Sequence, residues 1–307
     1  MSTNPTEVAV FSTIATTVAL INVPVIVLIF TAPALKKCKE LVLIGGVCGV
    51  DAVQNLFNAI LNVDRYLNFP NGTNVMVPNA SCFFRYYVVV LFYTQLLVGL
   101  APLLVSLERC AVIFYPIWYT VSYTRKKALL IILGSLIFCF IIHVMCYIIV
   151  LNSPPFNISI ICSGSAVYPP LAFSIQTSLR IVESGLGILL YVPISIRICQ
   201  MKVAQQKHVF VPSNSSISTL TSAKKEAEIQ MRRNIRFSIT IGMTCLSDLI
   251  LLFLPDIIIN FDLFGFKAFH LYFSRSNTLK TVVNLFIYTL RHNELRKELM
   301  TRLRFWH

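Results

Sequence analysis

Long apolar runs alternate with short polar and basic segments along most of the chain. A helix needs about 20 predominantly apolar residues to cross a bilayer, and seven runs approach or exceed that length. The seventh is the least apolar, because Arg275, Asn277 and Lys280 interrupt its first half. The pattern therefore predicts an all-α membrane protein in which 1–307 forms a single bundle of seven transmembrane helices. The predicted spans are 8–30, 41–63, 83–107, 128–151, 171–196, 237–259 and 269–290.

The composition agrees with lipid as the solvent of these helices. The chain is 56% hydrophobic and 13% charged, whereas soluble domains carry about 25% charged residues. Its net charge of +13 is also typical of proteins that bind nucleic acid. The basic residues, however, lie between apolar runs and not on one polar face. Membrane orientation explains them better, and we expect no nucleic-acid partner.

The basic residues also predict how the chain crosses the membrane. Most of the 26 Lys and Arg residues fall in alternate connections between the spans and after the seventh span. Basic segments stay on the cytoplasmic side during insertion. We therefore expect the N-terminus outside, the C-terminus inside and a location in the plasma membrane. Glycosylation sequons at Asn71, Asn79 and Asn157 all fall on the predicted outer side.

The nine cysteines lack the short paired spacing of a zinc site, and we expect no metal bound by them. Only Cys82 and Cys162 fall on the predicted oxidising side. A disulfide between them would tie the loop before the fifth span over the mouth of the bundle, and two free thiols are the alternative. The sequence also lacks a His/Glu metal pair, a Gly-x-Ser-x-Gly segment and a paired-Asp motif. We therefore expect neither an enzyme nor a bound cofactor.

Short motifs stand at characteristic places on the predicted spans. Glu108, Arg109 and Cys110 directly follow the third span, and Pro116 and Tyr119 come shortly after them. After the last span, 291–303 has leucines on one side and basic residues on the others, as in an amphipathic helix that lies along a membrane. The remaining motif residues are Asn22 on the first span, Asp51 on the second, Phe253-Leu254-Pro255 on the sixth and Asn284-Leu285-Phe286-Ile287-Tyr288 on the seventh.

Taken in order, these motifs resemble those of the rhodopsin-like G-protein-coupled receptors, which carry Asp-Arg-Tyr, Trp-x-Pro and Asn-Pro-x-x-Tyr at the corresponding places. The resemblance covers nearly the whole chain. It implies a receptor that transmits the binding of an extracellular small molecule or peptide to a heterotrimeric G protein. Leu91 stands where amine receptors have a binding Asp, and Thr278 stands where opsins have the retinal-binding Lys. With its degenerate motifs and short tail, the chain is most similar to nematode serpentine chemoreceptors.

The resemblance also implies a switch around Arg109. In the inactive state Arg109 would pair with Glu108. In the active state it would extend toward Tyr191 and Tyr288 and face the G protein. The alternative is an interfacial arginine that snorkels to water. Many relatives have an acidic residue at the base of the sixth span, where 232–236 contains arginines and no acid. We therefore expect a loosely held switch with ligand-free activity.

Polar groups deep in apolar helices need partners. By resemblance, Asn22, Asp51 and Asn284 would form a hydrogen-bonded cluster, and Asp248 on the sixth span is a further candidate for it. The family often holds Na⁺ at the residue that Asp51 matches. A cluster without sodium is the alternative, because Val98 replaces a serine of that site.

The candidate ligand residues are mostly charged, polar or aromatic groups on the third, fifth, sixth and seventh spans. Arg180 and Glu183 are three residues apart and share a face of the fifth span, where an intrahelical ion pair is the alternative role. Intramembrane charges are functional hypotheses by default. The other candidates are Leu91, Phe253, Asp256, Asn277 and Lys280.

A hydroxyl-rich stretch from Ser213 to Ser222 lies on the predicted cytoplasmic side. It is a candidate for phosphorylation by a kinase and for arrestin binding, with a flexible solvated loop as the alternative. The basic residues around it are expected to contact anionic lipids of the bilayer. For the whole chain, a small multi-pass transporter or ligand-gated channel is the alternative function. Transporters tend to have internal repeats and matching broken helices, and the sequence shows neither.

Overall fold

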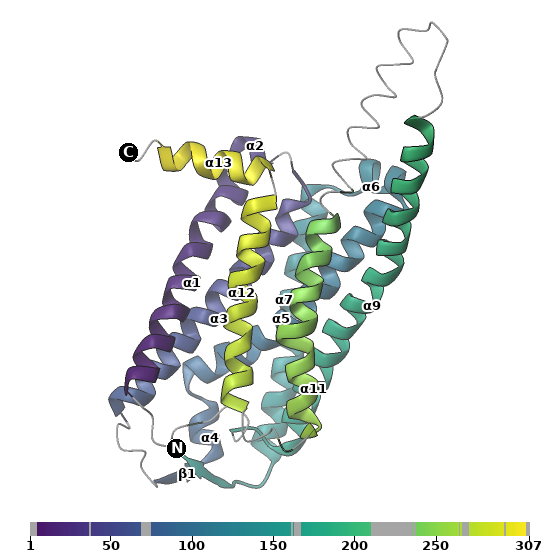
Figure 1. Cartoon of the computed structure of the whole chain (residues 1–307). Coiled ribbons are helices and arrows are strands. Elements are labelled where there is room, and N and C mark those ends of the chain that lie inside the picture. Colours follow the sequence, from purple (N-terminus) through teal and green to yellow (C-terminus); the bar gives the residue numbers. More distant parts are fainter. Residues whose placement is uncertain are drawn as a thin grey trace, which may run out of the picture.

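The computed structural model of the protein describes residues 5–36, 38–68, 75–160, 162, 167–209, 235, 238–263, 265, 270–291 and 293–304. It is a bundle of long helices with short elements at both ends (Figure 1). The elements are α1 (Pro5–Thr31), α2 (Pro33–Lys36), α3 (Leu41–Asn68), β1 (Met76–Pro78), α4 (Asn79–Phe83), α5 (Tyr86–Phe114), α6 (Pro116–Ser122), α7 (Arg125–Asn152), β2 (Asn157–Ser159), α9 (Pro170–Val209), η1 (Leu249–Phe253), α11 (Leu254–Asn260), α12 (His270–Arg291) and α13 (Asn293–Arg304).

Six of the described helices are long and apolar enough to cross a membrane, which indicates an all-α, multi-pass membrane protein. Large apolar side chains on α7, such as Leu130, Phe140 and Ile148, are exposed, as expected where lipid is the solvent. The six helices are Thr6–Thr31, Leu41–Asn68, Tyr86–Phe114, Arg125–Asn152, Pro170–Met201 and Ser238–Asn260, the last of which we call the sixth span.

α12 coincides with the predicted seventh span but is not among these six helices. With 22 residues it is long enough to cross a bilayer, but charged residues such as Arg275 and Lys280 lower its apolar character. It packs against α1, α3 and α11 within the bundle, and α13 runs across the bundle end beside α2 (Figure 1). A membrane crossing by α12 and a membrane-parallel α13 stay predictions.

Three helices run beyond the ends predicted from hydropathy, and the first is α3, which continues to Asn68, past the predicted end at 63. α5 continues to Phe114, past the predicted end at 107, and α9 continues to Val209, past 196. The added residues are more polar than the spans. A helix can continue beyond its apolar stretch because its backbone hydrogen bonds are internal and do not require apolar side chains. Hydropathy therefore detects the most apolar part of a helix and not its ends.

The sixth span contains a wide π-helical turn at Leu249–Phe253. Pro255 follows it and has no N–H, so it cannot bond to the carbonyl of Leu251 four residues earlier. The hydroxyl of Ser276 on α12 donates to that carbonyl at 2.8 Å. The proline and the π-turn thus open the helix ladder between Asp248 and Asp256, and α12 supplies the missing donor.

Cys82 and Cys162 form a disulfide, which confirms the predicted bond. Cys82 lies in the short helix α4 and does not open the third span, because a turn at Phe84 and Arg85 separates α4 from α5. Beside the bond, β1 pairs antiparallel with β2, with Val77 opposite Ile158. We call this end of the bundle the disulfide end, and the opposite end, with α2, α6 and α13, the α13 end (Figure 1).

Glycines allow α5 and α9 to pack closely. A Cβ at Gly187 would lie 2.8 Å from the backbone N of Leu103, and one at Gly99 would lie 2.8 Å from Cγ of Arg180. Small residues at helix contacts in membranes let the backbones approach. This close approach fixes where Arg180 lies relative to α5.

Gly187→Ala should lower the free energy of unfolding by about 1–3 kcal/mol, because the added methyl group meets backbone atoms that cannot rotate away. Gly134→Ala is the matched control, since no atom lies within 4 Å of a Cβ built on Gly134 of α7. Alanine there should stabilise the helix by up to about 1 kcal/mol. Thermal unfolding of both variants in detergent tests this. Equal shifts in the same direction would contradict the close α5–α9 contact.

Candidate functional site

Arg109 lies in the last turns of α5, at the α13 end. It is only 1% exposed, and its Nη2 lies 2.6 Å from Oε2 of Glu108, which is also buried. The other carboxylate oxygen of Glu108, Oε1, accepts a hydrogen bond of 2.9 Å from the hydroxyl of Tyr119 on α6. The arginine and its neighbouring acid therefore form a closed pair, and α6 is held to the same carboxylate.

Lys39, between α2 and α3, reaches across to α6. Its Nζ donates to the carbonyl oxygens of Tyr119 at 2.5 Å and Tyr123 at 2.7 Å, and lies 4.2 Å from the centre of the Tyr119 ring. A cation is favoured there, because the C-terminal end of a helix carries partial negative charge. Burial lowers the pKa of Lys39, while the carboxylates of Glu40 and Glu108 raise it.

This Lys39 tether was missed in the sequence, where Lys39 contributed only to the charge that orients the chain. The closest sequence signal for this contact is Tyr119 and Tyr123, the two tyrosines that Lys39 contacts. In the structure their rings stack with centroids 4.8 Å apart. Burial, with the added effect of Glu108, raises the pKa of Tyr119, so its hydroxyl stays a donor.

Tyr191 and Tyr288, expected to approach Arg109 in an active state, are engaged elsewhere in this structure. The hydroxyl of Tyr191 on α9 donates to the carbonyl oxygen of Ser238 at the start of the sixth span. Tyr288 on α12 is buried in the core cluster that also includes Ile241. Tyr191 thus connects α9 to the sixth span in the arrangement described.

Lys280 lies at the centre of a buried ionic cluster. Its Nζ is 3.4 Å from Oδ1 of Asp51 on α3 and 3.8 Å from Oδ1 of Asp248 on the sixth span. Asn284 donates to the same Asp248 oxygen at 3.2 Å, and none of the four residues is more than 4% exposed. Lys280, which we predicted among the ligand residues, therefore lies with the polar core and joins three helices.

The polar core otherwise differs from the expected one. Asn22 is buried and donates to the carbonyl of Val18 within its own helix, at 2.8 Å, and the described residues show no bond from it to Asp51 or Asn284. Asn55, one turn after Asp51, takes part of the place expected for Asn22. The side chain of Asn55 donates to the hydroxyl of Thr281 at 3.2 Å. Neither Asn55 nor Thr281 stood in a motif, so no sequence pattern pointed to them.

Toward the disulfide end, α9 and α11 are joined by an ion pair. Nη2 of Arg180 lies 2.5 Å from Oδ1 of Asp256. The alternative intrahelical pair of Arg180 with Glu183 is therefore wrong. Glu183 is 6% exposed, lies beside Gly99 of α5, and its Oε2 has no hydrogen-bond partner. Two buried carboxyl groups and one partly buried guanidinium thus lie in this part of the bundle.

The remaining ligand candidates lie on α5, η1 and α12. Leu91 is buried in α5, and the ring of Phe253 packs against Gly185 of α9. Asn277 is half-buried on α12, and its Oδ1 has no hydrogen-bond partner. Polar contacts that the sequence did not suggest join the helices nearby, including Gln176 to Gln95 at 2.8 Å.

The sequons differ in what they offer to a glycan. Asn157 is exposed at the start of β2. Asn79 is 2% exposed and its Oδ1 accepts a hydrogen bond from the backbone N of Phe156, so a glycan there does not fit this packing. Asn71 and the stretch from Ser213 to Ser222 lie outside the described residues.

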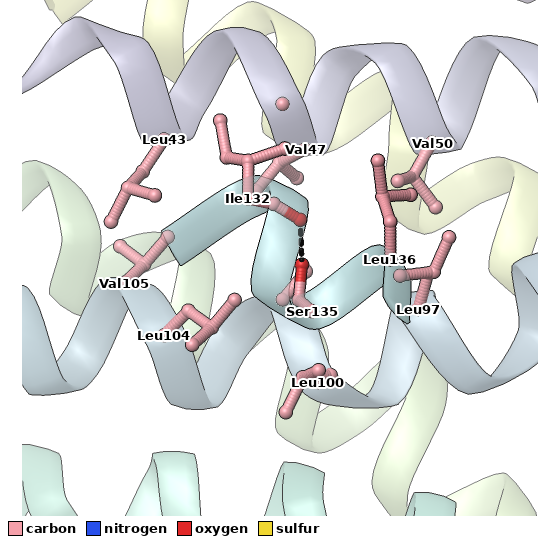
Figure 2. A pocket seen from close by; sticks show the side chains of 12 residues that line it. Leu43, Val47, Val50, Leu97, Leu100, Leu104, Val105, Ile132, Ser135 and Leu136 are labelled. Carbon is pink, nitrogen blue, oxygen red and sulfur yellow. Dashed lines mark hydrogen bonds between the residues drawn. The ribbon is translucent and has the colours of Figure 1, made fainter. Parts of the chain in front are cut away.

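An apolar pocket of about 40 Å³ lies between α3, α5 and α7. Figure 2 shows that its one labelled hydroxyl, of Ser135, bonds to the carbonyl of Ile132 on its own helix, at 2.7 Å. The other labelled side chains, such as Leu97 and Leu136, are apolar. A pocket without a polar group to orient a ligand is a weaker site than the charged groups on α9 and α11.

Comparisons with known proteins leave the chain to be interpreted from its own residues. No protein-family model matches it, and no curated protein matches it in sequence. Within the described part of the chain, no group of three or more His, Cys, Asp and Glu residues could hold a metal ion. The buried ionic groups of the bundle are therefore the basis for assigning a function.

Proposed function

We propose that the protein is a divergent rhodopsin-like G-protein-coupled receptor, most similar to nematode chemoreceptors, with seven spans and its α13 end in the cytoplasm. It binds an extracellular small molecule or peptide and activates a heterotrimeric G protein from the plasma membrane. The single observation that carries the proposal is the burial of Arg109 beside Glu108. An interfacial arginine without a further role extends to water, whereas this one is enclosed in protein.

The charges of α12 support its assignment as the seventh span. Arg275 pairs with Glu7 of α1, and Lys280 lies beside Asp51 and Asp248. Arg275 and Lys280 thus both have acidic partners on other helices, which lowers the cost of placing them in the membrane. A hydropathy scale counts the charges but not their partners.

The proposed mechanism is a shift between two packings of the same bundle. Ligand binding near Arg180, Glu183 and Asp256 would favour the packing in which the sixth span moves outward at its cytoplasmic end. That movement breaks the contact of Tyr191 with the carbonyl of Ser238. The freed tyrosine and Arg109 would then line the cytoplasmic pocket that receives the G protein.

The structure modifies the expectation about the resting state. The base of the sixth span has no acidic residue to hold the switch. The contact that remains is with α6, where the hydroxyl of Tyr119 donates to Glu108. Lys39 fixes α6 in turn by its contacts with two carbonyls. Ligand-free activity stays a prediction, and these contacts identify α6 as the element that limits it.

The decisive experiment measures nucleotide exchange on purified G protein with the purified receptor in lipid vesicles. The wild-type protein should accelerate exchange, and Arg109→Ala should reduce the acceleration by about tenfold, which corresponds to about 1.4 kcal/mol of lost interaction. Arg197→Ala, which removes an exposed arginine of α9, is the matched control. It should retain most of the activity at equal amounts of folded protein.

The same vesicles distinguish the alternative class. Ligand-evoked current or solute uptake in vesicles without G protein would instead support a channel or a transporter. A wild-type protein that leaves exchange unchanged across a broad ligand screen and several G-protein classes would contradict the receptor assignment.

A further inference from the structure

The Lys280 cluster places one ammonium between two carboxylates deep in the bundle. The three groups come from three helices: Asp51 from α3, Asp248 from the sixth span and Lys280 from α12. Carboxylates so deeply buried need a cation or a proton beside them, because the surrounding side chains cannot replace the hydration of two charges. The cation here belongs to the chain itself.

The geometry indicates that the ammonium is shared. Its distances to the two carboxylates, 3.4 and 3.8 Å, are both longer than the roughly 2.8 Å of a charge-assisted hydrogen bond to a single partner. An ammonium donates up to three hydrogen bonds in directions that its rotation adjusts, so a position between two acceptors suits it. A free monovalent cation between the same carboxylates would have the same role.

The space around the cluster leaves little room for another cation. The adjoining cavity, lined by Thr244, Asp248, Lys280, Asn284 and Tyr288 among others, has a volume of about 10 Å³. That is close to the smallest space that holds one water molecule. While the ammonium is present, a second cation would meet both a lack of room and repulsion from the first.

We propose that Lys280 is a tethered cation that fills a monovalent-cation site formed by Asp51 and Asp248, and that shortening this side chain opens the site to Na⁺. The oxygen atoms needed to bind the ion are already present. They come from the two carboxylates and from Asn284, whose Oδ1 is buried without a hydrogen-bond partner. Carboxylate and amide oxygens are ligands that suit hard cations.

The inference does not depend on the receptor assignment, because it concerns only what occupies the cluster. Its consequence is that a covalent link replaces an exchangeable ion at the contact of α3, α12 and the sixth span. The packing of these helices is then independent of the sodium concentration on either side of the membrane.

The test is the thermal unfolding midpoint of the purified full-length protein in sodium chloride and in choline chloride at equal ionic strength. Choline is too large for the cluster, and equal ionic strength keeps the screening of surface charges the same. The wild-type midpoint should be the same in both salts. Lys280→Ala should have a lower midpoint in choline chloride, and added sodium should raise it by several degrees with saturation, as expected for ligand binding to the folded state.

Two further variants place the effect. Lys280→Ala combined with Asp248→Asn should lose the sodium response, because one of the two carboxylates is gone. Arg275→Ala, a matched loss of a basic residue from α12 outside the cluster, should acquire none. If Lys280→Ala does not fold, Lys280→Ser shortens the side chain about as much and adds one oxygen ligand, and the same response is expected of it.

Each arm can overturn the proposal. Selective stabilisation of the wild-type protein by sodium would show that the ammonium does not fill the site, and this arm needs no variant. Indifference to sodium in folded Lys280→Ala or Lys280→Ser would show that no cation site lies beneath the side chain. A sodium response that survives Asp248→Asn would place the ion elsewhere.

Discussion

Replacing Arg180 with leucine should lower the free energy of unfolding by about 3 kcal/mol, because it leaves Asp256 buried without its cation. The side chain of Arg180 is 17% exposed and that of Asp256 is 7% exposed, so water screens the pair little. For a protein of this size, the loss corresponds to a fall of about 6 °C in the unfolding midpoint. Thermal unfolding in detergent measures it without reference to a ligand.

The double variant Arg180→Leu/Asp256→Leu separates the ion pair from the packing of the arginine stem. Replacing both members of a buried pair with apolar residues is often neutral, whereas removing one member is not. The double variant should therefore recover most of the lost stability. Arg197→Leu, at an exposed arginine of the same helix, should change the midpoint by less than 2 °C, which corresponds to less than about 1 kcal/mol. A double variant no more stable than the single one would show that lost packing causes the effect.

The apolar runs predicted the bundle because lipid imposes a simple rule on the helices that it surrounds. Each helix must present apolar side chains over a fixed length, and six of the seven runs match helices that meet this condition. The rule says nothing about how far a helix continues past its apolar stretch, which is why α3, α5 and α9 extend beyond their predicted ends. The rule also counts every charged residue as unfavourable, so α12 is the least apolar of the seven predicted spans.

Spacing along one helix predicted faces but not partners. Arg180 and Glu183 share a face of α9, yet Arg180 pairs with Asp256, which lies on another helix. Lys280 was placed with the ligand residues because of its charge, and the structure places it beside Asp51 and Asp248. In both cases the deciding contact joins residues far apart in the chain, and a single sequence contains no measure of that proximity.

The Cys82–Cys162 bond was predictable because only these two of the nine cysteines fall on the predicted outer side, where the environment is oxidising. The contacts of α6 were not predictable in this way. Tyr119 entered through a motif, but its bond to Glu108 and its contact with Lys39 depend on where α6 turns back against the bundle. A short helix after a span has no length or hydropathy signal that fixes its orientation.

Replacing both Cys82 and Cys162 with alanine should lower the free energy of unfolding by about 2–4 kcal/mol. The bond joins residues 80 positions apart, and closing so long a loop removes much of the conformational freedom of the unfolded chain. Helices α5 and α7 lie within the loop and keep much of their structure in detergent, which shortens its flexible part and reduces the gain. The thermal midpoint of the double variant, without reductant, measures the loss.

The matched control is Cys110→Ala/Cys199→Ala, which removes two cysteines that are not disulfide-bonded. It should leave the midpoint almost unchanged, because Cys199 is exposed and Cys110 only half-buried. The loop before α9 has other attachments: β2 pairs with β1, and Nη2 of Arg65 donates to the carbonyl of Cys162 at 2.9 Å. If the disulfide variant shifts no more than the control, these attachments hold the loop without the bond. A shift of the expected size instead shows that the covalent link is what keeps β2 and the loop against the disulfide end of the bundle.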